Sequence, residues 1–209
     1  MSFLDLSKRE VHVKIVYYGP GRGGKTTNLL HIHEAMTDAV RGQMVSIDTK
    51  QDRTLFFDFL PLSIGKIFGF DIRIQLFTVP GQVIYNATRK LVLKGVDGVA
   101  FIADSQVSQK EKNIESLENL RDNLADIGVD INKIPLVLQF NKQDLAAEGI
   151  PLLSEADMVS DLNSVYNVPC FNASALTGEG VFETLREISK TTVKSVARKL
   201  MPSLTSGMT

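Results

Sequence analysis

The chain has 209 residues, of which 44% are hydrophobic and 22% are charged, and its formal net charge is -1. These values are typical of a globular protein, and the near-neutral charge argues against a protein that holds nucleic acid through bulk electrostatics. The single cysteine, Cys170, excludes an internal disulfide and favours a reducing compartment. Because no apolar stretch approaches the roughly 20 residues of a membrane span, we expect a cytoplasmic location without integral membrane association.

Apolar stretches typical of strands alternate with amphipathic stretches typical of helices along the chain. One helical stretch carries an apolar stripe at three- and four-residue spacing, formed by Ile114, Leu117, Leu120, Leu124 and Ile127. The alternation predicts an α/β protein with a mostly parallel central sheet and helices on both faces. The stretches expected to form strands are 11–18, 44–47, 70–79, 98–103, 134–140 and 168–173.

One strand of this sheet is expected to run in the opposite direction. Gly69 offers a turn between two alternating stretches within 65–77, which predicts an antiparallel pair. No linker, repeat or low-complexity segment divides the chain. We therefore expect one domain over 1–200, followed by a short polar tail at 201–209 that we expect to be disordered.

A glycine-rich segment at 19–26 reads Gly-Pro-Gly-Arg-Gly-Gly-Lys-Thr. It satisfies the G-x-x-x-x-G-K-[ST] pattern of a phosphate loop, and it lies between an expected strand and an expected helix, as that motif requires. Lys25 would reach the β- and γ-phosphates of a nucleotide, and the Thr26 hydroxyl would coordinate Mg²⁺. The residues expected to contact the nucleotide here are Gly19, Gly21, Arg22, Gly23, Gly24, Lys25, Thr26 and Thr27.

A second motif, Asn-Lys-Gln-Asp at 141–144, indicates which base is bound. The Asp144 carboxylate can accept hydrogen bonds from the N1–H and the exocyclic amine of guanine. Adenine lacks both donors and would leave the carboxylate desolvated without partners. Asn141 would tie the loop together and contact the base, while the stem of Lys142 would cover the face of the base.

A third motif, Asn-Ala-Ser-Ala-Leu-Thr at 172–177, follows the last expected strand. Its centre, formed by Ser174, Ala175 and Leu176, resembles the short loop of small GTPases whose backbone N–H binds the carbonyl oxygen of guanine. The alternative is that Ser174 or Thr177 caps the N-terminus of a helix.

With these motifs the chain resembles the Ras-like small GTPases along nearly its whole length. Three stretches resemble the bacterial MglA family more closely: Lys-Ile-Val-Tyr-Tyr-Gly-Pro-Gly at 14–21, Asp-Arg-Thr-Leu-Phe-Phe-Asp-Phe-Leu-Pro at 52–61 and Thr-Val-Pro-Gly-Gln at 78–82. The resemblance covers about 3–194. It implies a P-loop NTPase of the Ras-like type, a single G domain that binds GTP or GDP with Mg²⁺ and hydrolyses GTP slowly.

The same resemblance implies a role in cell polarity or gliding motility and a set of partners. The expected activator is a homodimeric roadblock-fold protein similar to MglB, which would reposition a switch segment of an otherwise monomeric chain. Effectors would read the switch segments 53–62 and 81–89 when GTP orders them, and partners would concentrate the protein at a cell pole.

Two residues are expected to act in hydrolysis. Gln82 follows Gly81 directly, where the family orients the attacking water, although a lone glutamine can also be a solvated loop residue. Gly81 would give its N–H to the γ-phosphate. Arg53 matches an arginine finger acting in cis, and the neighbouring Thr54 would reach Mg²⁺ and the γ-phosphate. The alternative is that Arg53 is a surface arginine paired with a nearby aspartate.

Thr78 departs from the pattern of the eukaryotic relatives, which carry an aspartate at the start of Asp-x-x-Gly. That carboxylate holds Mg²⁺ through a water molecule, and a threonine supplies no charge. The metal site would then rest on Thr26 and Thr54, and we predict weaker Mg²⁺ retention in the diphosphate state than in a Thr78→Asp variant.

The apolar stretch 55–62 has two interpretations: a partner-binding patch, or a strand that packs on the sheet, which is favoured. The switch hypothesis also has competitors. One is a nucleotide-dependent binding module with little intrinsic hydrolysis, which the threonine at position 78 keeps open. A P-loop kinase is disfavoured, because the chain has no arginine cluster and the Asn-Lys-Gln-Asp motif would have no role.

Overall fold

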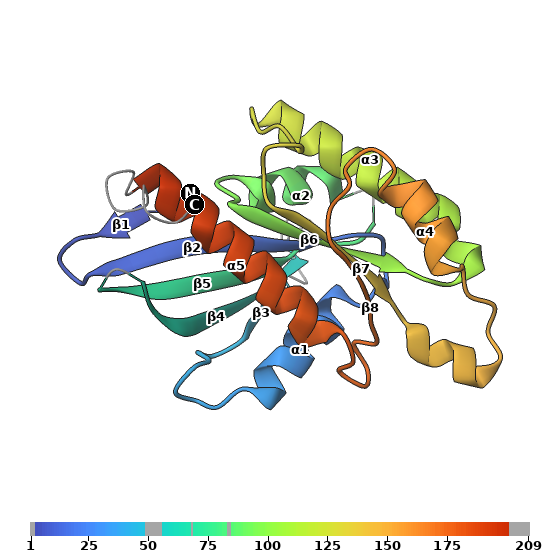
Figure 1. Ribbon diagram of the computed structural model, residues 1–209, viewed down its shortest axis with the longest axis horizontal. Coiled ribbons are helices and arrows are strands. Elements are labelled where there is room, and N and C mark those ends of the chain that lie inside the picture. The colour runs from blue at the N-terminus through green and yellow to red at the C-terminus, as the bar shows by residue number, and fades with distance from the viewer. Residues whose placement is uncertain (1–2, 49–55, 68, 83–84, 201–209) are drawn as a thin grey trace.

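The computed structural model describes residues 3–48, 56–67, 69–82 and 85–200. In these residues an eight-stranded sheet carries helices on both faces, as predicted (Figure 1). The sheet order is β3-β4-β5-β2-β6-β7-β8, and β1 pairs with β2 beside this path. The strands are β1 (Phe3–Asp5), β2 (Glu10–Tyr18), β3 (Val45–Asp48), β4 (Phe56–Ile67), β5 (Phe70–Thr78), β6 (Gly98–Asp104), β7 (Leu136–Asn141) and β8 (Cys170–Asn172).

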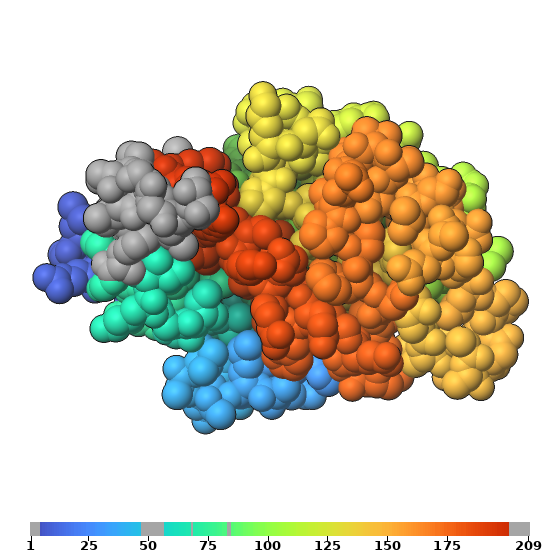
Figure 2. Space-filling view, in the orientation of Figure 1, coloured from blue at the N-terminus to red at the C-terminus, as the bar shows by residue number. Residues whose placement is uncertain are grey.

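The helices divide into two layers. Helices α1 and α5 share one buried cluster with the sheet, and α2, α3 and α4 share the other. Figure 2 shows that α5 lies at the surface, in the middle of this face of the molecule. None of the described helices is long and apolar enough to cross a membrane. Their bounds are α1 (Lys25–Ala35), α2 (Asn86–Leu93), α3 (Lys110–Asp126), α4 (Glu155–Leu162) and α5 (Val181–Leu200).

Strand β2 contributes to both layers, because successive side chains of a strand point to opposite faces. Val13, Ile15 and Tyr17 belong to the cluster under α1 and α5, whereas Val16 and Tyr18 belong to the cluster under α2, α3 and α4. All are fully buried. The phosphate loop therefore begins from a strand that is fixed on both faces.

Two strands run against the others: β4, which is antiparallel to both β3 and β5 and was expected, and the short β1, which is antiparallel to β2. The turn at Gly69 was predicted correctly, and its φ of 82° is a value that favours glycine. The pair is longer than 65–77, because β4 already begins at Phe56. Leu60 and Leu62 are buried in the core, which confirms the packed-strand interpretation for the described part of 55–62.

Strands β2, β5, β6, β7 and β8 run parallel, so their carboxyl ends meet at one edge of the sheet. Ligands of open α/β sheets bind outside this edge. Each predicted motif follows one of these strands, which places all of them on the same side of the molecule. β1, α2 and α4 have no counterpart among the elements expected from the sequence, and the tail at 201–209 lies outside the described residues. The single domain over 1–200 stays a prediction.

Candidate functional site

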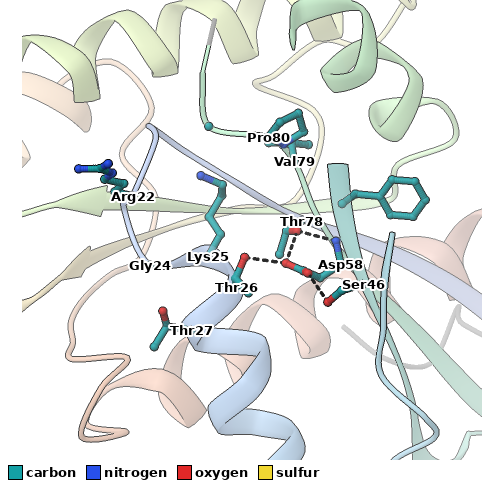
Figure 3. A pocket seen from close by; sticks show the side chains of 12 residues that line it. Arg22, Gly24, Lys25, Thr26, Thr27, Ser46, Asp58, Thr78, Val79 and Pro80 are labelled. Carbon is teal, nitrogen blue, oxygen red and sulfur yellow. Dashed lines mark hydrogen bonds between the residues drawn. The ribbon is translucent and has the colours of Figure 1, made fainter. Parts of the chain in front are cut away.

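The phosphate loop joins β2 to α1 and requires glycine for steric reasons at two positions. A Cβ added to Gly19 would lie 2.2 Å from the carbonyl oxygen of Ile102, and one added to Gly24 would lie 2.1 Å from Nδ2 of Asn141. Both glycines have positive φ, 142° and 100°. The loop is therefore pressed against β6 and against the residue that ends β7. Arg22 is exposed and points away from Lys25 and Thr26 in Figure 3.

Lys25 is a buried cation at the start of α1, with 6% of its surface exposed. Its Nζ donates to the carbonyl oxygens of Gly19 and Pro20, at 3.0 and 2.7 Å. Burial and, to a smaller extent, the charge of Arg89 lower the pKa of Lys25 to about 7, against the opposing effect of the Asp58 carboxylate. Such a site favours an anion, because a phosphate beside the ammonium stabilises its charged form.

Asp58 of β4 lies at the centre of a cluster of hydroxyl groups beside Thr26 (Figure 3). Its Oδ2 accepts hydrogen bonds from Oγ1 of Thr26 at 2.6 Å and from Oγ1 of Thr78 at 2.8 Å. Its Oδ1 accepts from Oγ of Ser46 at 2.8 Å. The backbone N–H of Asp58 in turn donates to Oγ1 of Thr78 at 2.8 Å, so the two residues hold each other in place.

This role of Asp58 was not predicted from the sequence, where Asp58 was one of three aspartates (with Asp48 and Asp52) that could pair with Arg53. The signal was present, because Asp58 precedes Leu60 and Leu62 at two-residue spacing. An acidic side chain on the buried face of an alternating strand needs polar partners. Here its partners are hydroxyl groups from α1, β3 and β5.

A cavity of about 570 Å³ opens between these groups. It brings together the phosphate loop, the first turn of α1, the ends of β3 and β5, and the start of β4. Of the residues predicted to bind the nucleotide, those at its wall are Arg22, Gly24, Lys25, Thr26, Thr27 and Gly81; the residues not predicted include Ser46, Phe57 and Asp58.

The segment Gly81–Gln82 lies directly on the phosphate loop. A Cβ added to Gly81 would lie 2.2 Å from Cα of Gly21, so only a glycine allows this contact. A Cβ added to Gly21 would lie 3.6 Å from the carbonyl carbon of Gly81 and 3.9 Å from Cγ of Gln82. Gln82 therefore lies beside the phosphate loop. A second cavity of about 390 Å³ lies next to it and is lined by residues of both segments.

Asn141 links the phosphate loop to the loop at 174–176. Its Nδ2 donates to the carbonyl oxygen of Gly23 at 2.8 Å, and its Oδ1 accepts from the backbone N–H of Ala175 at 2.8 Å. Lys142, in the left-handed region with a φ of 73°, pairs with the buried Asp104 at 2.6 Å. Asp144 follows at the start of a 3-10 turn, half-buried.

The loop at 174–176 is closed by its own hydrogen bonds. Oγ of Ser174 accepts from the N–H of Thr177 at 3.2 Å, and the Ser174 N–H donates to the carbonyl oxygen of Glu179 at 2.9 Å. The serine therefore shapes a turn, and α5 begins only at Val181. Leu176 at the loop tip is 73% exposed. Two expected site residues, Arg53 and Thr54, lie outside the described residues.

No family model matches the chain. The chain is 55% identical over 190 residues to the Mutual gliding-motility protein MglA of Myxococcus xanthus (strain DK1622). The aligned part covers 91% of this chain and 95% of that protein.

Proposed function

Because the chain belongs to the MglA family of Ras-like small GTPases, which bind guanine nucleotides, we propose that it is a GTP-hydrolysing switch in bacterial gliding motility or cell polarity. The observation that carries the proposal is the convergence of the phosphate loop, Gly81–Gln82 and the Asn-Lys-Gln-Asp segment at one edge of the sheet. Asn141 of the last segment bonds to Gly23 of the phosphate loop and to Ala175 of the loop at 174–176.

In this proposal the phosphates bind in the cavity beside Lys25. The ammonium would give up its bonds to the carbonyl oxygens of Gly19 and Pro20 and turn to the β- and γ-phosphates. The backbone N–H groups of the loop and the N-terminus of α1 would complete the cradle. Guanine would bind at the Asp144 carboxylate, with Lys142 over its face.

A Mg²⁺ ion fits the oxygen-rich group around Asp58, since Mg²⁺ prefers hard oxygen ligands. Thr26 would bind the ion directly, and Asp58 would supply the negative charge that Thr78 lacks. Thr54 would be a further ligand from the switch segment 53–62. When bound, the ion would neutralise charge on the β- and γ-phosphates. This assignment adds a carboxylate to the expected metal ligands Thr26 and Thr54.

Hydrolysis would rest on groups that stabilise charge and orient water. Gln82 would orient the attacking water, and the Gly81 N–H would donate to the γ-phosphate. Lys25 and the arginine finger, Arg53, would stabilise the charge that develops on the transferring group, an effect worth roughly three to five orders of magnitude for the arginine alone.

The switch would be read by proteins and not by nucleic acid. A homodimeric roadblock-fold protein similar to MglB is the proposed activator, and effectors would bind the segments 53–62 and 81–89. Since Leu60 and Leu62 are buried, the effector surface along β4 would use its other face, where Phe57 and Phe59 are half-buried against Phe77.

Single-turnover hydrolysis of GTP by the wild type, Gln82→Ala and Arg53→Ala tests this proposal. Each variant should bind GTP and hydrolyse it at least about tenfold more slowly than the wild type. If neither variant loses activity, the catalytic assignment is wrong. If the wild type itself binds GTP without hydrolysing it, alone or with its activator, the chain is a nucleotide-dependent binding module.

A further inference from the structure

Arg89 of α2 is fully buried and joins Pro80 and Gly81 to α3. Its Nε donates to the carbonyl oxygen of Pro80 at 2.8 Å, and its Nη2 donates to the carbonyl oxygen of Gly81. Its Nη1 donates to Oδ1 of Asn119 at 2.6 Å. One planar guanidinium thus holds two successive carbonyl groups immediately before Gln82.

A network of neutral side chains fixes the far end of this contact. The Tyr18 hydroxyl donates to Oδ1 of Asn119 at 2.6 Å, and Nδ2 of Asn119 donates to Oδ1 of Asn86 at 3.1 Å. Asn123 donates to Asn86 at 2.7 Å and to the Tyr18 hydroxyl at 3.0 Å. The Arg89 guanidinium also lies 5.2 Å from the ring centroid of Tyr18, within the range of a cation–π contact.

The charge of Arg89 has no ion-paired carboxylate among the residues that the structure describes. A buried charge without a counterion costs folding free energy. A side chain that only anchored α2 would therefore cost less if it were neutral. Arg89 also lines the second cavity together with Gly21, Gly81 and Gln82. Its charge therefore lies beside the phosphate loop.

We infer that Arg89 is a positioning residue for GTP hydrolysis. By holding the carbonyl groups of Pro80 and Gly81, it keeps the Gly81 N–H and the Gln82 side chain beside Gly21 of the phosphate loop. This inference rests on the proposed GTPase function and adds a residue to it. A lysine would keep the charge but could not present two N–H groups from one rigid plane, so it would only partly replace the arginine.

The test compares Arg89→Gln and Arg89→Lys with the wild type in single-turnover hydrolysis at saturating GTP. Since a displacement of about 1 Å in a catalytic group can cost roughly 100-fold in rate, Arg89→Gln should be roughly 10- to 100-fold slower, and Arg89→Lys should lie between it and the wild type. The dissociation constant of GDP, measured with a fluorescent analogue, should stay within about threefold of the wild-type value.

The matched control is Lys90→Gln. It removes a positive charge one residue away on α2, where Lys90 pairs with Asp126 at the surface. Its rate should equal that of the wild type. Hydrogen exchange provides a readout independent of activity: the peptide containing 78–82 should exchange faster in Arg89→Gln than in Lys90→Gln.

A wild-type hydrolysis rate in Arg89→Gln would overturn the inference, and so would a loss of GDP affinity as large as the loss of rate. A wild-type protein that hydrolyses no GTP would instead overturn the proposed function. If Arg89→Gln fails to fold, as judged by thermal unfolding, Asn119→Ala and Arg89→Lys take its place. Wild-type rates in both of these would overturn the inference.

Discussion

The hydroxyl of Thr26 donates to the carboxylate of Asp58, with 2.6 Å between Oγ1 and Oδ2. Thr26 comes from the first turn of α1 and Asp58 from the third residue of β4, so the contact joins the phosphate loop to the reversed strand. Thr78, at the position of the usual acidic residue, donates to the same oxygen atom at 2.8 Å. The acidic group of the site therefore comes from β4 and not from the neighbouring β5. Thr78 of β5 orients this carboxylate by its hydrogen bonds.

We predict that Asp58→Asn weakens Mg²⁺ binding in the GDP-bound protein by about 10- to 100-fold. The amide keeps most of the shape of the carboxylate but supplies no negative charge. A Mg²⁺ titration followed by the release rate of a fluorescent GDP analogue measures the effect. Asp71→Asn is the control, because Asp71 of β5 pairs with Lys66 at the surface, far from the hydroxyl cluster. Equal Mg²⁺ affinities in the wild type and Asp58→Asn would contradict the assignment.

Thr78→Asp should destabilise the Mg²⁺-free protein, although the sequence alone favours it as the better metal ligand. The new carboxylate would lie beside that of Asp58, and two like charges in one buried site disfavour ionisation of both. We expect the free energy of unfolding to fall by about 0.5–3 kcal/mol in EDTA, measured by denaturant unfolding. Thr78→Ser, which keeps both hydrogen bonds, should remain close to the wild type. A stabilised Thr78→Asp protein without Mg²⁺ would contradict this.

GDP affinity should fall as pH rises from 7 to 9. The pKa of Lys25 in the free protein is about 7, so the lysine is charged below that pH and becomes neutral above it. A bound phosphate favours the charged form, so above pH 7 binding takes up a proton, and the affinity declines by up to about tenfold per pH unit. Calorimetry in buffers of different ionisation enthalpy would detect the proton. Lys25→Arg, which stays charged, should lose this dependence, and a flat wild-type profile would refute the prediction.

Gly21→Val should block hydrolysis while leaving GTP bound, whereas Gly21→Ala should be milder. A Cβ at this position meets only ordinary contacts with Gly81 and Gln82, at 3.6 and 3.9 Å. The additional methyl groups of valine need space that these two residues occupy. We expect the single-turnover rate of Gly21→Val to fall roughly 100-fold, with a much smaller loss in Gly21→Ala. A valine variant as fast as the wild type would show that Gln82 acts elsewhere.

The sequence predicted most of the site, because its chemistry resides in short contiguous motifs at the ends of strands. The phosphate loop, Gly81, Gln82 and Asn141 meet at one edge once parallel strands are assumed. Asp58 was missed because its role arises from three elements far apart in sequence. The alternation of β4 places its one acidic residue, Asp58, on the buried face, and this combination would have identified the role of Asp58.

The arrangement around α2 could not be predicted in the same way. Arg89 is an unremarkable arginine in an amphipathic segment, and its contacts depend on how α2 packs against α3. A charged residue in such a segment is most often exposed, so periodicity alone assigns it to the solvent. Strand β1 was not predicted because its three residues are too few to show an alternation of apolar and polar side chains.

We expect the two hydrogen bonds of Asn141 to make release of the nucleotide cooperative. One side chain holds both the carbonyl group of Gly23, in the phosphate loop, and the N–H of Ala175, in the loop at 174–176. Loosening either loop weakens the support of the other. A protein that speeds nucleotide exchange would therefore need to displace only one of these two loops to loosen both.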